Sequence, residues 1–259
     1  MVTIAHASVA GAEDRVPFEH ALVLAERSGA KLISVHASGD PGAQARMIAA
    51  ADVLREWGRD ASAVEHVRHV HDCCPDPVDT VLDFLRRVEP DLVVAGAHQR
   101  RGATRIFAES RSEAIAENVR VPTLTVPLEG RAFVRGGALE LSRLVVPAGD
   151  GEAAAVGMER AAWLADLARA EDVTVELLFV GEAGEEPALE PPRHPRIRWT
   201  TRTVGGDFEE AVTVVSAAAS AIVMATRGQD SLRDALLGTH TERVMRIARC
   251  PVLSVPIER

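Results

Sequence analysis

Aromatic residues are scarce in this chain: they make up 3% of its 259 residues, and tyrosine is absent. Hydrophobic residues still reach 47%, so the core must be built mainly from aliphatic side chains. Proteins that bind single-stranded nucleic acid stack bases on aromatic rings, so this scarcity argues against that function. The net charge of −9 also argues against general binding to a phosphate backbone. We therefore expect no nucleic acid partner.

Long apolar runs and paired cysteines are also missing. No stretch reaches the roughly eighteen apolar residues that a membrane-spanning helix needs, so we expect no membrane partner. Residues 1–7 look like a first strand and lack the features of a signal peptide. Cys73 and Cys74 are adjacent and Cys250 is distant, which does not make a disulfide framework. These features favour a cytoplasmic protein.

The sequence contains one pattern twice. The second copy reads A-T-R-G-Q-D-S-L-R-D-A-L-L-G-T from Ala225 and ends with C-P-V-L-S-V-P from Cys250. The first copy reads G-A-H-Q-R-R-G-A-T-R-I-F-A-E-S from Gly96 and ends with V-P-T-L-T-V-P from Val121. A repeat of about half the chain indicates two domains of ordinary size. We place them at 1–128 and 142–259, joined by a linker at 129–141.

Short apolar strands alternate with helices in both halves. In the first half we expect strands at 2–5, 32–36, 64–71, 92–95 and 122–126, and helices at 17–28, 44–57, 78–88 and 111–118. In the second half we expect strands at 144–146, 173–180, 197–204, 221–225 and 252–255, and helices at 152–170, 208–218 and 241–248. A proline-rich stretch, 181–196, takes the place of one helix and predicts a mobile loop.

This alternation is typical of βαβ units with a parallel sheet. Strands that are apolar throughout are expected where helices cover both faces of the sheet. Together with the right-handed crossover rule, the pattern predicts an α/β fold in which each half is a doubly wound, five-stranded parallel-sheet sandwich.

The segment after Ala225 has the features of an anion-binding loop. The chain turns through Gly228 and reaches Gly238 and Thr239 immediately before a helix. Glycines let backbone N–H groups approach an anion, and a helix N-terminus adds unpaired donors and a favourable dipole. In an open α/β sheet such a loop lies at the carboxyl ends of the strands, where ligands bind. The two glycines alone would equally suit simple turns.

The surrounding residues resemble the end of a universal stress protein domain. Nucleotide-binding members of that family carry G-x-x-G, nine residues, then G-S/T; here Ala225 replaces the first glycine and the rest is kept. The segments V-V-P-A-G-D-G and E-R-V-M-R-I-A-R-C-P-V-L-S-V-P also fit. Because the resemblance covers both halves, the chain is similar to a tandem universal stress protein with an adenine nucleotide alpha hydrolase-like fold. The resemblance implies a pseudo-twofold pair of halves, for which we expect contact through the last strands.

The resemblance also implies a binding site for ATP, or for AMP or ADP, in the C-terminal half. The phosphates would lie on the loop, and the adenine beside the ends of the first two strands of that half. The expected site residues are Pro147, Ala148, Asp150, Val180, Met224, Ala225, Gly228, Gly238, Thr239 and His240. Family members use an aspartate two residues after the strand-ending proline; here Gly149 occupies that position and Asp150 follows. Asp150 suits a turn or helix cap equally well.

The first half departs further from the nucleotide-binding pattern. Gln99 replaces the second glycine and Glu109 the third. A carboxylate about 4 Å from a phosphate charge costs about 4 kcal/mol at an effective dielectric constant near 20. We therefore expect nucleotide in the C-terminal half only.

Other polar clusters have simpler interpretations. His66, His69, His71, Cys73 and Cys74 could bind zinc, but no second Cys/His pair follows at a suitable spacing. A polar strand edge is the better interpretation, without a metal. The arginines near the first loop are best interpreted as a solvated face, and Cys250 as a core thiol.

No catalytic set is present in the sequence: both the G-x-S-x-G elbow and the Walker motif are absent. The favoured function is nucleotide-dependent stress signalling through a protein partner, with possible homodimers. Two alternatives stay open. One is a nucleotide-free interaction module, and the other is a slow ATPase in which His240 lies beside the phosphates.

Overall fold

A computed structural model describes residues 1–72, 77–97, 120–226 and 240–257. The chain divides into two compact units. The first contains residues 1–128 and 134–139, and the second contains residues 129–133 and 140–259. Within the described ranges, none of the helices is both long and apolar enough to span a bilayer.

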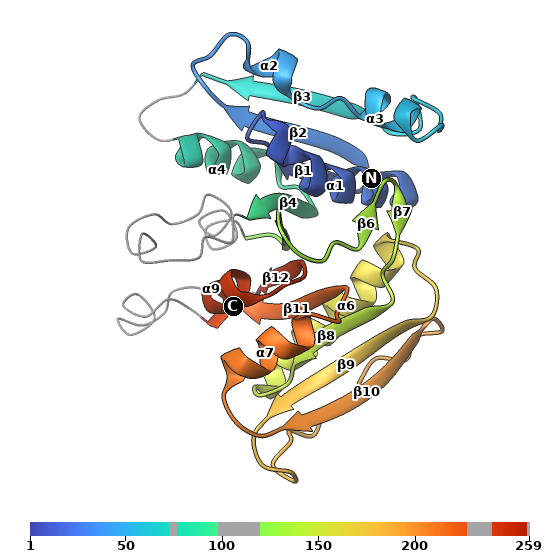
Figure 1. The fold of residues 1–259 in the computed structure, drawn as a ribbon, viewed down its shortest axis with the longest axis vertical. Helices are drawn as coiled ribbons and strands as arrows, with labels where there is room; N and C mark the ends of the chain where they lie inside the picture. The colour runs from blue at the N-terminus through green and yellow to red at the C-terminus, as the bar shows by residue number, and fades with distance from the viewer. Residues whose placement is uncertain (73–76, 98–119, 227–239, 258–259) are drawn as a thin grey trace. The chain divides into compact units, whose positions relative to one another are not determined.

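The first unit is a parallel sheet with helices packed on it (Figure 1). Its sheet order is β5-β4-β1-β2-β3, and every pairing in it is parallel. The strands are β1 (Thr3–Ala7), β2 (Lys31–Ala37), β3 (His66–His71), β4 (Leu92–Ala97) and β5 (Thr123–Pro127). The helices are η1 (Ala12–Asp14), α1 (Arg15–Ser28), α2 (Ala43–Arg46), α3 (Ala50–Glu56) and α4 (Pro77–Val88). The helix expected at 111–118 lies outside the described residues.

The second unit has the same architecture, with order β10-β9-β8-β11-β12 and parallel pairing throughout. The strands are β8 (Arg143–Pro147), β9 (Val173–Val180), β10 (Ile197–Val204), β11 (Ala221–Thr226) and β12 (Val252–Pro256). The helices are α6 (Gly151–Leu167), α7 (Phe208–Ser216) and α9 (His240–Ile247). Figure 1 shows α6 behind the strands and α7 in front of them. The predicted α/β class, with two five-stranded parallel sheets, is confirmed.

The prediction of a single helix over 44–57 is wrong, because two short helices, α2 and α3, occupy this stretch. Met47 has extended backbone angles (φ −66°, ψ 132°), which ends α2. Arg68 on β3 donates to the Met47 carbonyl at 2.9 Å, and the Ala50 N–H donates to the His66 ring at 3.1 Å. In a continuous helix, the Met47 carbonyl and the Ala50 N–H would form hydrogen bonds within the helix. Here side chains of the neighbouring strand β3 form those hydrogen bonds instead.

The segment 129–141, interpreted as a linker, contains an antiparallel hairpin of β6 (Val134–Arg135) and β7 (Ala138–Leu139). Its turn uses Gly136 and Gly137, both with positive φ. The Gly136 N–H donates to Glu19 at 3.1 Å, and Arg59 donates to the Gly137 carbonyl at 2.8 Å. The turn is thus bound to α1 and to the residues after α3 within the first unit.

The proline-rich stretch 181–196 contains no helix, as predicted. It is nevertheless bonded to β10 and α6. The Trp199 indole donates to the Pro192 carbonyl at 3.0 Å, and the Thr203 hydroxyl donates to Glu186. At its end, Arg196 forms an ion pair with Asp166.

Gly157 sets how closely α6 approaches the sheet of the second unit. A Cβ placed on it would lie 2.8 Å from Val146 Cγ1 on β8 and 3.5 Å from the Val223 carbonyl on β11. Val146 and Val223 are fully buried, so neither side chain has room to move aside.

We expect Gly157→Val to destabilise the protein by about 2 kcal/mol, because the added side chain must push α6 away from β8. Ala155→Val on the exposed side of the same helix introduces the same side chain without the clash, and should cost only about 0.5 kcal/mol through the lower helix propensity of valine. Urea unfolding of both variants measures the difference. Equal midpoints for the two would show that the contact at Gly157 is unimportant.

Candidate nucleotide site

The strand order of the second unit creates a reversal between β8 and β11. From β8 the chain adds β9 and β10 on one side, and then crosses to place β11 and β12 on the other. β8 and β11 are neighbours, with Val145 paired to Ile222. In open α/β sheets the crevice for ligands lies outside the carboxyl ends of the strands at such a reversal.

The structure places the described candidate residues at this end of the sheet. Pro147 ends β8, and the buried Ala148 that follows donates its N–H to the Leu178 carbonyl at 2.8 Å. Val180 is the last residue of β9. Met224 and Ala225 lie near the end of β11, paired with β12. Because these strands are parallel, their carboxyl ends meet at one edge.

The phosphate-binding part of the prediction is only partly described. Gly228, Gly238 and Thr239 lie outside the described residues. His240 is the first residue of α9, which contacts α7 and β12. Since β11 ends at the carboxyl edge and β12 starts at the opposite edge, α9 begins on the side where β11 ends. In the sequence, the glycine loop comes immediately before this N-terminus.

Asp150 is the N-cap of α6. Its Oδ1 accepts N–H groups from Glu152 at 3.0 Å and Ala153 at 3.1 Å, and its backbone is extended. The carboxylate is exposed, and nothing lies within 4 Å of a Cβ placed on Gly149. The structure thus shows the helix-cap role, while adenine recognition by Asp150 stays a prediction.

The corresponding turn of the first unit is closed by a carboxylate that the sequence analysis missed. Asp14 in η1 is 2% exposed and folds back onto the end of β1. It accepts the Ser8 hydroxyl at 2.5 Å, the Val9 N–H at 2.9 Å and the Ala10 N–H at 2.9 Å. Ala10 has a φ of 53°, which helps direct these donors to one carboxylate. The spacing from Ser8 to Asp14 is not a recognised turn signal, so the sequence offered little to find it.

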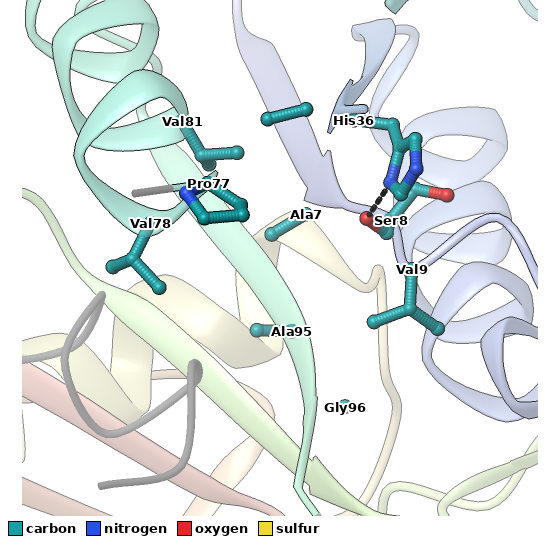
Figure 2. Close-up of a pocket in the computed structure, with 10 residues that line it drawn as sticks. Ala7, Ser8, Val9, His36, Pro77, Val78, Val81, Ala95 and Gly96 are labelled. Carbon is teal, nitrogen blue, oxygen red and sulfur yellow. Dashed lines mark hydrogen bonds between the residues drawn. The ribbon is translucent and has the colours of Figure 1, made fainter. Parts of the chain in front are cut away.

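A hollow lies beside this turn, at the carboxyl ends of β1, β2 and β4 (Figure 2). Its cavity volume is about 40 Å³, enough for a few water molecules. His36 Nδ1 lies 2.8 Å from the Ser8 carbonyl, which can only accept, so this nitrogen carries the proton. The other lining residues are mostly aliphatic: Ala7, Val9, Ala37, Pro77, Val78, Val81, Ala95 and Gly96. The loop residues Gln99 and Glu109, on which the predicted loss of binding rests, lie outside the described residues.

The described histidines of β3 are engaged in packing. His69 and His71 pack against Phe84, with ring centroids 5.1 Å and 4.9 Å from it. His66 hydrogen-bonds to Ser34 and Ala50. Cys73 and Cys74 lie outside the described residues, and among those described no three His, Cys, Asp or Glu side chains could hold a metal.

Cys250 is a core thiol, as predicted: it is 1% exposed, and burial raises its pKa to about 12. Its thiolate is therefore scarce at neutral pH, which argues against a reactive role.

Comparison with known proteins identifies the class to which this architecture belongs. A sequence model of the Universal stress protein family matches residues 11–127 and 189–256, together more than half of the chain. The chain therefore belongs to the universal stress protein family, as its resemblance implied. No curated protein sequence matches it.

Two solved structures share this fold over nearly the whole chain. A universal stress protein from Archaeoglobus fulgidus DSM 4304 is 16% identical, with a TM-score of 0.64 and 98% of each chain covered. A functionally unknown protein from Pseudomonas aeruginosa PAO1 is 13% identical, with a TM-score of 0.63, covering 98% of this chain and 92% of its own. At these identities, the likeness shows the fold alone.

Two substitutions at Asp150 separate its structural role from ligand recognition. Asp150→Ala should destabilise the protein by about 1 kcal/mol because α6 loses its cap, whereas Asp150→Asn should retain most of the stability. Urea unfolding measures both, and Asp207→Ala at the N-cap of α7 is a matched control. If Asn lowers nucleotide affinity without lowering stability, the carboxylate contacts the ligand.

Proposed function

We propose that the second unit binds an adenine nucleotide, ATP or else ADP or AMP, and that nucleotide binding serves stress signalling. The observation that carries this proposal is the meeting of β8, β9 and β11 at one sheet edge, directly before the glycine loop and α9. The half-buried Pro147 and Val180 supply aliphatic surfaces suited to a planar base, next to the small, buried Ala148. The sequence of the loop supplies glycines and Thr239 for phosphates.

In the proposed mechanism the adenine lies beside the ends of β8 and β9. The phosphates meet backbone N–H groups of the loop and the first turn of α9, where the helix dipole favours negative charge. Contact with the nucleotide changes the surface that residues 226–240 present to a protein partner. No covalent step is required, so in this mechanism the chain acts by binding alone. We place it in the cytoplasm. Contact between the last strands of the two halves, or between two copies of the chain, is part of the same proposal.

Gly238→Glu should weaken ATP binding by about a thousandfold, since the new carboxylate would face the phosphates. Isothermal titration of the full chain measures this. Gly205→Glu is a matched control: it adds the same charge where an added Cβ meets nothing within 4 Å, and should leave affinity unchanged.

The same titration tests the first unit. The Gly238→Glu chain retains an unaltered first unit, so micromolar ATP binding that survives this substitution would contradict the restriction of nucleotide to the second unit. Absence of binding by the unsubstituted chain would favour the nucleotide-free interaction module instead.

Restoring the aspartate of the family pattern should improve the site. Gly149→Asp places a carboxylate two residues after Pro147, in open space and with Asp150 still available to cap α6. We expect about tenfold tighter ATP binding, because one charged hydrogen bond to the adenine is gained. Guanosine triphosphate should gain nothing, and equal gains for both nucleotides would argue against an adenine contact at this position.

A further inference from the structure

A continuous row of polar side chains, buried except for the half-buried His66 at its start, crosses the first unit from β3 to the turn after β1. His66 Nε2 lies 2.9 Å from Ser34 Oγ, and Ser34 Oγ lies 3.3 Å from His6 Nδ1. His6 Nε2 makes no hydrogen bond, and lies 3.8 Å from Asp14 Oδ1. Asp14 in turn holds the Ser8 hydroxyl and the N–H groups of the turn. One polar chain therefore connects an edge strand to the turn beside the hollow.

The hydrogen-bond partners fix where the protons lie in this chain. His66 Nδ1 accepts the Ala50 N–H, so its Nε2 carries the proton and donates to Ser34. The Ser34 hydroxyl can then donate to His6 Nδ1, which leaves the His6 proton on Nε2, facing Asp14. Both imidazoles are neutral in this arrangement. A proton added to His6 Nδ1 would require the Ser34 hydroxyl to rotate and accept instead of donate, and a proton added to His66 Nδ1 would face the Ala50 N–H donor.

Few groups near His6 could stabilise a charge. It pairs with Ser34 on β2 and with Val94 on β4, and α1 packs Phe18 against its ring at 5.4 Å between centroids. Phe18 also contacts the His66 ring, again at 5.4 Å. Asp14 from η1 is the carboxylate that faces His6, and Arg68 on β3 acts on His66. Asp14 is thus the group toward which a charged His6 would be drawn.

We propose that the chain His66–Ser34–His6–Asp14 is a proton-operated latch, which keeps the turn Ser8–Ala10 closed at neutral pH and releases it in mild acid. A charged His6 competes with Val9 and Ala10 for the carboxylate of Asp14. When Asp14 turns toward His6, the Val9 N–H and the Ser8 hydroxyl lose their acceptor, and the Ala10 N–H keeps only the Ser8 oxygen, 3.0 Å away. Because Ser8 and Val9 line the hollow, release of the turn exposes new donors there.

The direction of the pKa shifts agrees with this latch. Burial lowers the pKa of His6 to about 4 against the attraction of Asp14, and burial also lowers that of His66 to about 4. The ordinary pKa of a histidine ring is 6.5, and each ring regains it to the extent that opening brings the ring into contact with water. The closed turn is therefore fully stabilised above pH 6.5 and loses this stabilisation as the pH falls toward 4. Full recovery of the ordinary pKa by each ring would make opening about twentyfold more frequent per histidine between pH 7 and pH 5, which is the upper limit of the effect.

The second unit provides an internal reference. The turn after β8 is not closed in this way, because Asp150 is exposed and bonds forward to the start of α6. No histidine lies on β8, and His194, which pairs with Asp166, is remote from that turn in the chain. Acid should therefore affect the two turns differently.

The test is amide hydrogen exchange of the full chain, read by mass spectrometry on fragments covering residues 3–14 and 144–156. Rates are corrected for the intrinsic pH dependence, and circular dichroism checks that the chain stays folded at pH 5. We expect the 3–14 fragment to exchange at least twentyfold faster at pH 5 than at pH 7. The 144–156 fragment should change less than twofold.

Variants locate the effect in the latch. His66→Gln keeps a donor for Ser34 but cannot titrate, and lies on a half-buried edge strand; it should reduce the pH effect by up to about twentyfold. His194→Gln should leave it unchanged. Asp14→Asn preserves the shape but removes the charge, and should open the turn already at pH 7. Equal acid effects on the two fragments, or an unchanged pH effect in His66→Gln, would overturn the proposal.

Discussion

Parallel strand pairing with a reversal of strand order is the constraint on which both units depend. It gathers the carboxyl ends of β1, β2 and β4 in one unit, and of β8, β9 and β11 in the other. Both candidate sites lie at the turns that leave these strand ends. In open α/β sheets such a reversal favours a crevice there, because successive crossovers depart in opposite directions on either side of the two central strands. Small residues such as Ala148 and Gly96 line this edge, and Gly157 lets α6 lie close beneath it.

The two units use an aspartate at this edge in different ways. Asp150 points forward and caps the following helix, which leaves the strand end open. Asp14 points backward and occupies the donors of its own turn, so the first unit supplies an internal anion where a ligand could otherwise approach. The repeat therefore conserves the architecture while the chemistry of the two turns diverges. Burial of Asp14 also places it 3.8 Å from His6, and the proposed response of that turn to acid rests on this contact.

The elements that the sequence predicted well are those with a strong local pattern. Strands such as 173–180 and 197–204 match the structure because both runs are rich in β-branched residues, which favour extended backbone. The helix at 44–57 failed because its break is decided by Arg68, which is distant in the sequence and binds the Met47 carbonyl. The candidate residues Pro147, Ala148, Val180, Met224 and Ala225 could be placed at one edge from the strand order alone. The position of Asp14 and the hollow could not be predicted, because no local pattern in residues 8–14 indicates that the Asp14 carboxylate folds back onto the end of β1.

The sequence by itself determined the repeat, the α/β class, the family and the position of the glycine loop, because each of these follows from the order and spacing of residues along the chain. Tertiary structure decided the rest. It determines which backbone groups are hydrogen-bonded by side chains, and which carboxylate caps a helix or closes a turn. It also determines which histidines are buried away from water. Burial and hydrogen bonding depend on residues brought together from distant strands, as His6, Ser34 and His66 are. A pattern along the chain does not encode those distances directly.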